Sequence, residues 1–288
     1  MNYYAFIAGL PDLFFDEHKK IFTIKEFRDE LELLLSKKDK KIIQNLFLKH
    51  DNENLLSYLK FGEENMHFDE MGIFSKEDLA SMIEYVKSEE WDKKWNKKYP
   101  EYFSLFLTDY FANEEQSVVY MEDHLAGLYY NYLYKTKNEF LRSWSMLNMN
   151  MRNILTALSC RRKGINYDHL IVGDNEVATT LKNTNNPNQY LLELIDYFDD
   201  VRNIDEEKDI LKKEQAIDKL LWSWIEENTF FHYFDIEKIM GYLFKLQIIE
   251  RWKILDKEQG SRIFREIVLD LKKGIDKVKN IDNKNNTI

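Results

Sequence analysis

Three aspartates are the side chains best spaced for metal chemistry in this chain of 288 residues. Asp196, Asp199 and Asp200 form the pattern Asp-x-x-Asp-Asp. Carboxylates grouped in this way can bind Mg²⁺, which in turn holds a diphosphate group. The second acidic motif that would complete such a site, Asn-Asp-x-x-Ser-x-x-x-Glu, does not follow downstream, and no basic cluster lies nearby to hold the diphosphate. We therefore favour an exposed acidic helix face over a metal site.

No other set of side chains in the sequence indicates catalysis or a cofactor. Glu64 and His67 have the Glu-x-x-His spacing of di-iron bundles, but two such motifs are needed. The 6 histidines never stand four residues apart, and metalloprotease, phosphate-loop and nucleophile-turn motifs are absent. The single cysteine, Cys160, excludes an intrachain disulfide. We predict no metal, no cofactor and no enzymatic activity, although a triad assembled from distant residues would leave no such motif.

The elements that position these side chains are expected to be helices. Hydrophobic residues make up 44% and aromatic residues 15% of the chain, while only 3 prolines and 9 glycines supply turns. An all-β protein would need more turn residues than this. Thr23 with Glu26, and Ser75 with Asp78, have the capping-box spacing that marks a helix start. The fold class we predict is all-α.

The longest predicted helix runs from Glu139 to Lys163 and ends at Gly164, the usual residue of a left-handed helix end. Large apolar residues recur at steps of four and three, which places them on one face: Phe140, Trp144, Leu147, Met151, Ile154 and Leu158. The facing stripe is polar and comprises Arg142, Asn148, Asn150, Arg152, Asn153 and Thr156.

The basic end of this helix is a candidate contact surface. Arg161, Arg162 and Lys163 stand where cations favour the negative end of the helix dipole. Together with Arg152, they are the residues that we predict to bind a partner protein. The alternative is ordinary solvation of a basic helix end.

Several other segments carry expectations about organisation. Residues 171–189 are the most loop-like and indicate a boundary between lobes. Asp51 to Asn54 are expected to cap a helix over Leu55–Leu59. Residues 199–213 are strongly charged and predict a solvated helix or connector. Ser261–Val278 should form a last helix, and residues 280–288 a frayed tail.

Net charge and hydropathy exclude two classes of partner. The formal net charge of −10 argues against nucleic-acid binding and against direct binding to an anionic lipid surface. An acidic protein could instead receive a basic partner. No apolar run approaches the roughly 20 residues of a membrane span, and the N-terminus lacks the basic region of a signal peptide. We therefore expect cytoplasmic residence without insertion into the membrane.

A weak internal repeat is centred on the long helix. The segments Asn54-Leu55-Leu56-x-x-Leu59, Asn153-Ile154-Leu155-x-x-Leu158 and Gln247-Ile248-Ile249-x-x-Trp252 share one pattern, and a glycine follows each of them: Gly62, Gly164 and Gly260. The period of about 100 residues is too long for a solenoid and favours three similar helical lobes.

These segments also carry a family resemblance. MNMRNILTALSCRRKGI resembles the repeated Asn-x-x-x-x-Leu-(Arg/Lys)-x-(Arg/Lys)-x-Gly helix in the family of the C-type subunit of V-type and archaeal-type ATPases, known as the d-type subunit in eukaryotic V-ATPases. KHDNENLLSYLKFG is similar to the first copy, and IEKIMGYLFKLQIIERWKILDKEQG to the last. The opening MNYYAFIAGLPDL resembles a short bacterial branch of this family, although Ala8-Gly9-Leu10-Pro11 replaces the usual Ala-Arg pair. The resemblance runs in patches from Met1 to about Val268.

The resemblance implies a fold, a role and partners. It implies three pseudo-repeated lobes forming a funnel, with approximate bounds 1–105, 106–185 and 186–279. The protein would be a non-catalytic central-stalk adaptor that couples the shaft to the membrane proteolipid ring during proton or other ion transport or ATP synthesis. Its partners would be the central-shaft subunits and the ring, which would place it at the inner face of the cell membrane through the complex.

Two rival functions stay open on the sequence alone. One is a metal-dependent enzyme similar to helical isoprenoid synthases, which would use Asp196, Asp199 and Asp200. The other is a generic helical interaction protein, which would share the composition but would not associate with an ATPase.

Overall fold

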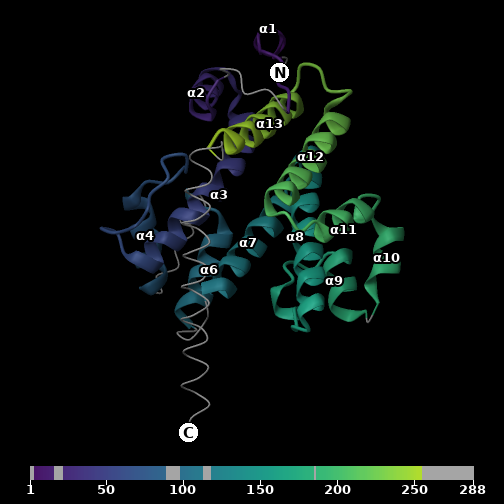
Figure 1. Cartoon of the computed structure of the whole chain (residues 1–288). Coiled ribbons are helices and arrows are strands. Elements are labelled where there is room, and N and C mark those ends of the chain that lie inside the picture. The colour runs from purple at the N-terminus through teal and green to yellow at the C-terminus, as the bar shows by residue number, and fades with distance from the viewer. Residues whose placement is uncertain (1–2, 16–21, 89–97, 113–117, 185, 255–288) are drawn as a thin grey trace. The chain divides into compact units, whose positions relative to one another are not determined.

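The computed structural model describes residues 3–15, 22–88, 98–112, 118–184 and 186–254. Within these ranges every regular element is a helix (Figure 1), so the all-α prediction is confirmed. The elements are α1 (Tyr4–Ala8), α2 (Ile24–Leu34), α3 (Lys37–Phe61), α4 (Lys76–Lys87), α6 (Glu101–Ala112), α7 (Val118–Tyr134), α8 (Glu139–Lys163), the 3-10 turn η1 (Asp168–Leu170), α9 (Glu176–Asn183), α10 (Pro187–Leu194), α11 (Phe198–Glu206), α12 (Ile210–Thr229) and α13 (Ile236–Ile254).

Both predicted capping boxes are present. The backbone N–H of Thr23 donates to Glu26 Oε2 at 2.8 Å, and the N–H of Glu26 donates back to Thr23 Oγ1 at 3.1 Å. Ser75 and Asp78 make the same reciprocal pair at the start of α4, with both bonds at 3.2 Å. These bonds satisfy amide groups that the first turn of a helix otherwise leaves without partners.

The long helix predicted from the sequence is α8. Asn138 caps its start by accepting the N–H of Leu141 at 2.9 Å, and Gly164 ends it with a left-handed φ of 65°. Most of the predicted apolar face is buried, including Leu147 and Ile154. The predicted polar stripe is partly wrong, because Asn150 and Asn153 are only 2% and 0% exposed.

Three other expectations differ from the structure. Asp51 to Asn54 lie inside the continuous helix α3 and do not begin a helix. The segment 171–189 contains α9 and the start of α10, because the Asn175 side chain caps α9 and Pro187 occupies the first turn of α10, where its missing N–H costs little. Residues 199–213 are mostly exposed helix and connector, as expected, and differ from the expectation only in burying Val201, Ile204 and Asp205. The predicted helix 261–278 and tail 280–288 lie outside the described residues.

The chain divides into two units. Among the described residues, the second unit combines residues 3–15 and 22–30 with residues 232–254, so the N-terminal segment packs with α13. The N–H of Tyr3 donates to the carbonyl of Phe234 at 2.9 Å, and the N–H of Ile24 donates to Glu250 Oε1 at 2.7 Å. The rings of Phe27 and Tyr242 stand 5.1 Å apart within this unit. The division into three lobes inferred from the sequence stays a prediction.

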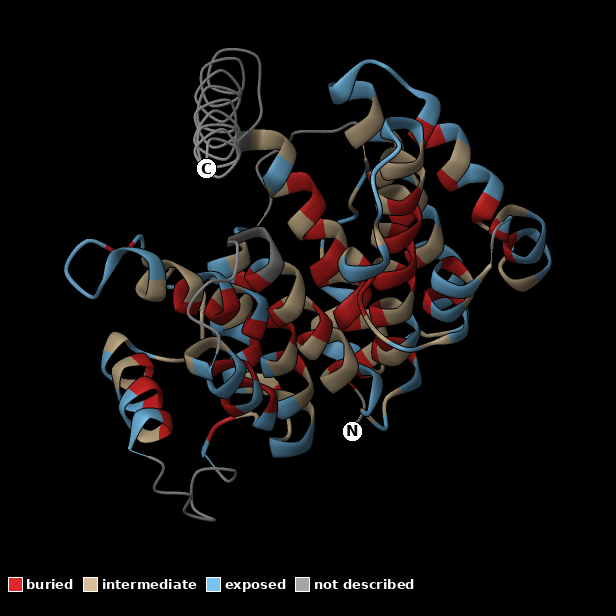
Figure 2. Ribbon diagram, turned by 90° about the horizontal axis from the view of Figure 1, so that it is seen from below, coloured by how far each residue is buried: buried red, intermediate tan, exposed pale blue. Residues whose placement is uncertain are grey.

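The first unit comprises residues 31–231 and holds the two described copies of the repeat pattern. α7 lies against α3, α6 and α8, while α6 also contacts α4. α8 contacts α9 and α11 as well, and α12 packs on α11. Buried positions run along these helices as stripes (Figure 2), and four phenylalanines of the core are at most 1% exposed: Phe47, Phe103, Phe106 and Phe198.

Asn54 and Asn153, the buried first residues of the two described repeat copies, make the same pair of hydrogen bonds. Asn54 donates from Nδ2 to the carbonyl of Asp69 at 2.9 Å and accepts the N–H of Asp69 at 2.7 Å. Asn153 donates to the carbonyl of Val172 at 2.8 Å and accepts its N–H at 2.9 Å. Each asparagine therefore holds both backbone groups of one residue in the loop that follows its helix.

A second pair of buried residues stands one turn earlier on each helix. Asp51 Oδ1 accepts the N–H groups of Ile73 and Phe74, both at 2.9 Å, just before the cap of α4. Asn150 Oδ1 accepts Nδ2 of Asn175, the cap of α9, at 2.7 Å. Each long helix thus fixes the start of a later helix in the chain.

Glycines allow the loops to approach the anchoring residues closely. A Cβ atom at Gly72 would lie 2.6 Å from Asp51 Oδ1 and 2.9 Å from Asn54 Nδ2. A Cβ atom at Gly173, whose φ is 83°, would lie 2.8 Å from the sulfur of Met149. The two copies of the repeat therefore share a helix, a buried polar anchor, a glycine-containing loop and a capped helix.

We predict that Asn153→Ala lowers the free energy of unfolding by about 2–4 kcal/mol, because the buried N–H and carbonyl of Val172 both lose their partner. Asn148→Ala is the matched control on the same helix. Asn148 is half-buried and bonds only the carbonyl of Trp144 in its own helix, so its loss should cost less than about 1 kcal/mol. Urea unfolding of both variants measures the difference. Equal losses of unfolding free energy would contradict the role of Asn153 in holding the Val172 backbone.

Candidate functional site

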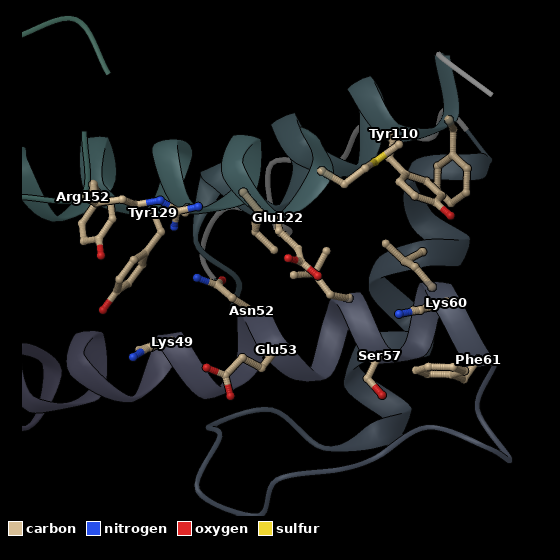
Figure 3. A pocket seen from close by; sticks show the side chains of 17 residues that line it. Lys49, Asn52, Glu53, Ser57, Lys60, Phe61, Tyr110, Glu122, Tyr129 and Arg152 are labelled. Atoms are coloured by element: carbon tan, nitrogen blue, oxygen red, sulfur yellow. The ribbon is translucent and has the colours of Figure 1, made fainter. Parts of the chain in front are cut away.

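A groove of about 720 Å³ is the main candidate for binding in the described part of the chain. α3 forms one side, and α6, α7 and one residue of α8 form the rest (Figure 3). Apolar side chains line it: Leu56, Leu59, Phe61, Phe111, Met121, Leu125 and Ala126. Charged side chains of both signs also line it: Lys49, Glu53, Lys60, Glu122 and Arg152.

The charges on the α3 side alternate along the groove. Lys49, Glu53 and Lys60 follow one another along α3 and are all exposed (Figure 3). Glu122 reaches in from α7, and Arg152 of α8 is held by an ion pair with Asp123. A surface that combines apolar residues with exposed charges of both signs is typical of protein–protein contacts. It is poorly suited to a small anion, which would meet Glu53 and Glu122.

Two tyrosines of the groove, Tyr129 and Tyr130, are largely buried. The hydroxyl of Tyr129 donates to the carbonyl of Asn45 at 3.2 Å, and the hydroxyl of Tyr102, next to it, donates to Asn52 Oδ1 at 2.7 Å. Burial raises the pKa of Tyr129 and also the pKa of Tyr130. These phenols stay protonated at neutral pH, so they do not provide a general base.

The basic end of α8 is mostly occupied by contacts within the chain. Arg161 donates from Nε to the hydroxyl of Tyr167 at 2.8 Å and from Nη1 to Asn188 Oδ1 at 3.3 Å. Arg162 pairs with Asp205. Lys163 is exposed.

Arg152 stands apart from the other three predicted partner-binding residues. It lines the groove nine positions before Arg161, which is about 13 Å along the helix axis. The structure therefore brings Arg161, Arg162 and Lys163 together but leaves Arg152 in a different place. Partner binding by these four residues stays a prediction.

Asp205 is the charged residue of this region that the sequence pattern did not reveal. Its side chain is 3% exposed, and it accepts Lys213 Nζ at 3.0 Å in addition to its pair with Arg162. Burial, and then the nearby Arg162 charge, lower the pKa of Lys213. The strong charge of residues 199–213 hid this site, because acidic and basic residues in one run usually mark a solvated segment.

The acidic motif considered for Mg²⁺ does not assemble into a cluster. Asp196, Asp199 and Asp200 are exposed, and Asp199 pairs with Arg202 at 2.8 Å. Asp196 and Asp200 line a second pocket of about 640 Å³ together with Lys212 and Lys219, so two basic side chains do lie near the motif, contrary to the expectation from the sequence. Glu64 and His67 do not share a helix face, because both residues follow the end of α3.

Within the described residues, two groups could hold a metal ion by geometry. One comprises His50, Glu53 and Asp69, and the other His232, Asp235 and Glu237. The sequence offered little signal for the first group, because Asp69 lies far from the other two residues along the chain.

Among the described helices, none combines the length and the apolarity that crossing a membrane would require.

We predict that Arg162→Met lowers the free energy of unfolding by about 1–3 kcal/mol, because buried Asp205 would keep only Lys213 as a charged partner. Arg162 is itself 52% exposed, which limits the loss through solvent screening. Arg202→Met is the matched control. Its pair with Asp199 is exposed on both sides, so the change should be within about 0.5 kcal/mol. Thermal or urea unfolding measures both losses. If Arg202→Met loses as much stability as Arg162→Met or more, the stabilising role of the Arg162–Asp205 pair is refuted.

Comparison with known proteins gives one family. No curated protein and no solved structure was found to match the chain significantly. Residues 1–275 match the family described as "Protein of unknown function (DUF2764)", which covers nearly the whole chain. The chain therefore belongs to this DUF2764 family.

Proposed function

We propose that the chain is a non-catalytic adaptor in the central stalk of a V/A-type rotary ATPase, similar to the C-type or d-type subunit. In this role it would couple the rotating shaft to the membrane proteolipid ring and would make or break no covalent bond. It would reach the inner face of the cell membrane through the complex. The three-lobe funnel of that family is part of the proposal.

One observation carries the proposal most strongly. The two segments that resemble the repeated motif of the C-type subunit, around the buried Asn54 and Asn153, make the same pair of hydrogen bonds to the loops that follow their helices. The resemblance rests on sequence letters alone, and chance similarity between amphipathic helices would not produce the same anchor twice. This supports a true internal repeat, which is the feature that suggested the family.

The mechanical properties of the first unit fit an adaptor. α3 and α8 each span 25 residues, and each is tied by buried side chains to a later loop. Torque passing through such helices meets hydrogen bonds and packed side chains that resist bending. The groove beside α3 offers exposed charges of both signs to a partner surface.

The rival enzyme has no comparable support. The three aspartates that would bind Mg²⁺ are exposed, and one of them is paired with Arg202. A generic interaction protein stays the main alternative, and it differs from the adaptor in what it binds.

The test is a pull-down of the tagged full chain from its own membranes in mild detergent, with partners identified by mass. We expect the central-shaft and proteolipid-ring proteins in a defined ratio. Recovery of the chain alone, while those proteins are present in the lysate, would contradict the proposal and leave the generic interaction protein.

Charge reversal in the groove and at the end of α8 tests which of these two surfaces binds the proposed ATPase partners. We expect Lys49→Glu with Glu53→Lys, or Lys163→Glu, to reduce recovery of the partners at least about fivefold, which corresponds to about 1 kcal/mol. These residues are exposed, so the fold should survive. Lys41→Glu, exposed near the start of α3, is the control. A surface whose variant recovers partners as well as the control does is not part of the interface.

A further inference from the structure

His50, Glu53 and Asp69 meet where α3 faces the loop that leads to α4. One ligand atom of each lies within 4.8 Å of the other two. His50 and Glu53 are three residues apart on α3 and therefore share a helix face. His50 Nδ1 lies 2.6 Å from Asp69 Oδ2. The group thus joins a helix to a loop through side chains that commonly bind metals.

Asp69 is held in place independently of His50. Its backbone N–H and carbonyl are both bonded by the buried Asn54, and its Oδ1 accepts the N–H of Met71 at 2.8 Å. A carboxylate that is already immobilised loses little entropy when it binds a cation.

The second copy of the repeat indicates that the fold does not need these three side chains. Asn153 occupies the position of Asn54, so Met149 corresponds to His50, and Arg152 to Glu53. Val172, whose backbone Asn153 holds, corresponds to Asp69. The same helix and loop are anchored there with no histidine or carboxylate at these three positions. The three ligand-type residues of the first copy therefore call for another explanation.

Two other histidine–acid groups in the described residues are weaker candidates, because one caps a helix and the other has only two members. Asp235 pairs with His232 at 2.6 Å, and its Oδ1 accepts the N–H of Lys238 at the start of α13, so it acts as a helix cap. His124 pairs with Asp109 at 2.8 Å but belongs to no three-member group among the described residues.

We propose that His50, Glu53 and Asp69 form a binding site for a divalent transition-metal ion, with Zn²⁺ as the best match. One imidazole nitrogen and two carboxylate oxygens are ligands that Zn²⁺ accepts, and water would complete four-coordination. Binding needs the neutral imidazole and both carboxylates, so any proton on His50 leaves to solvent. The separation of His50 Nδ1 and Asp69 Oδ2 would widen to about 3.3 Å, the spacing of ligands around tetrahedral zinc.

The site would act on the neighbouring surface. Glu53 also lines the groove, so an ion bound there would neutralise one of its charges and tie α3 to the loop before α4. This inference is independent of the proposed ATPase role, because it concerns only side chains within the chain.

The test is calorimetric titration of the metal-free full chain with ZnCl₂. All proteins carry His232→Gln, so that the group at the start of α13 does not contribute. We expect saturable binding of one ion per chain, weakened at least about tenfold by His50→Gln and by Glu53→Gln. His124→Gln, which removes a histidine of a two-member pair, should leave the affinity unchanged.

Two results would overturn the site. One is the absence of saturable binding in the His232→Gln protein. The other is binding that stays as strong as in the His232→Gln protein after either His50→Gln or Glu53→Gln is added. Because Glu53 is exposed, its variant keeps the fold, and the test does not depend on the stability of the His50 variant.

Discussion

The bond pair between a buried asparagine and the backbone of a following loop is the constraint on which the first unit depends. A loop residue whose N–H and carbonyl are buried must find partners or lose stability. Asn54 and Asn153 supply both partners from the middle of a long helix. This fixes where each loop turns, and the neighbouring residues Asp51 and Asn150 then fix where the next capped helix begins.

The same constraint sets the surface that the proposed partner would contact. Because α3 is bonded to the following loop and packed on α7, its exposed charges Lys49, Glu53 and Lys60 are held in fixed positions along the groove. The proposed adaptor role requires a rigid contact surface, because a surface that deforms would not transmit torque. The salt bridge between Arg162 and the buried Asp205 likewise restrains the C-terminal end of α8.

Local sequence signals predicted the helices well and the polar interior poorly. The capping boxes at Thr23 and Ser75 and the end of α8 at Gly164 follow from rules that involve only a few neighbouring residues. Asn153 and Asp205 were assigned to polar or solvated stretches because their partners lie 19 and 43 residues away. The candidate groove and the group around His50 arise from several helices and a loop, so periodicity could not reveal them. The internal repeat was the one long-range signal in the sequence, and it pointed to the anchoring asparagines.

Native-state hydrogen exchange at the backbone amides of Asp69 and Val172 tests the anchor most directly. Both amides lie in loops, where exchange is usually fast. If the asparagine side chains hold them, their exchange should be slowed to nearly the rate of global unfolding, and Asn153→Ala should release Val172 while leaving Asp69 protected. Fast exchange at both amides in the unmodified chain would contradict the account, because the loops would then be held by something other than the two asparagines.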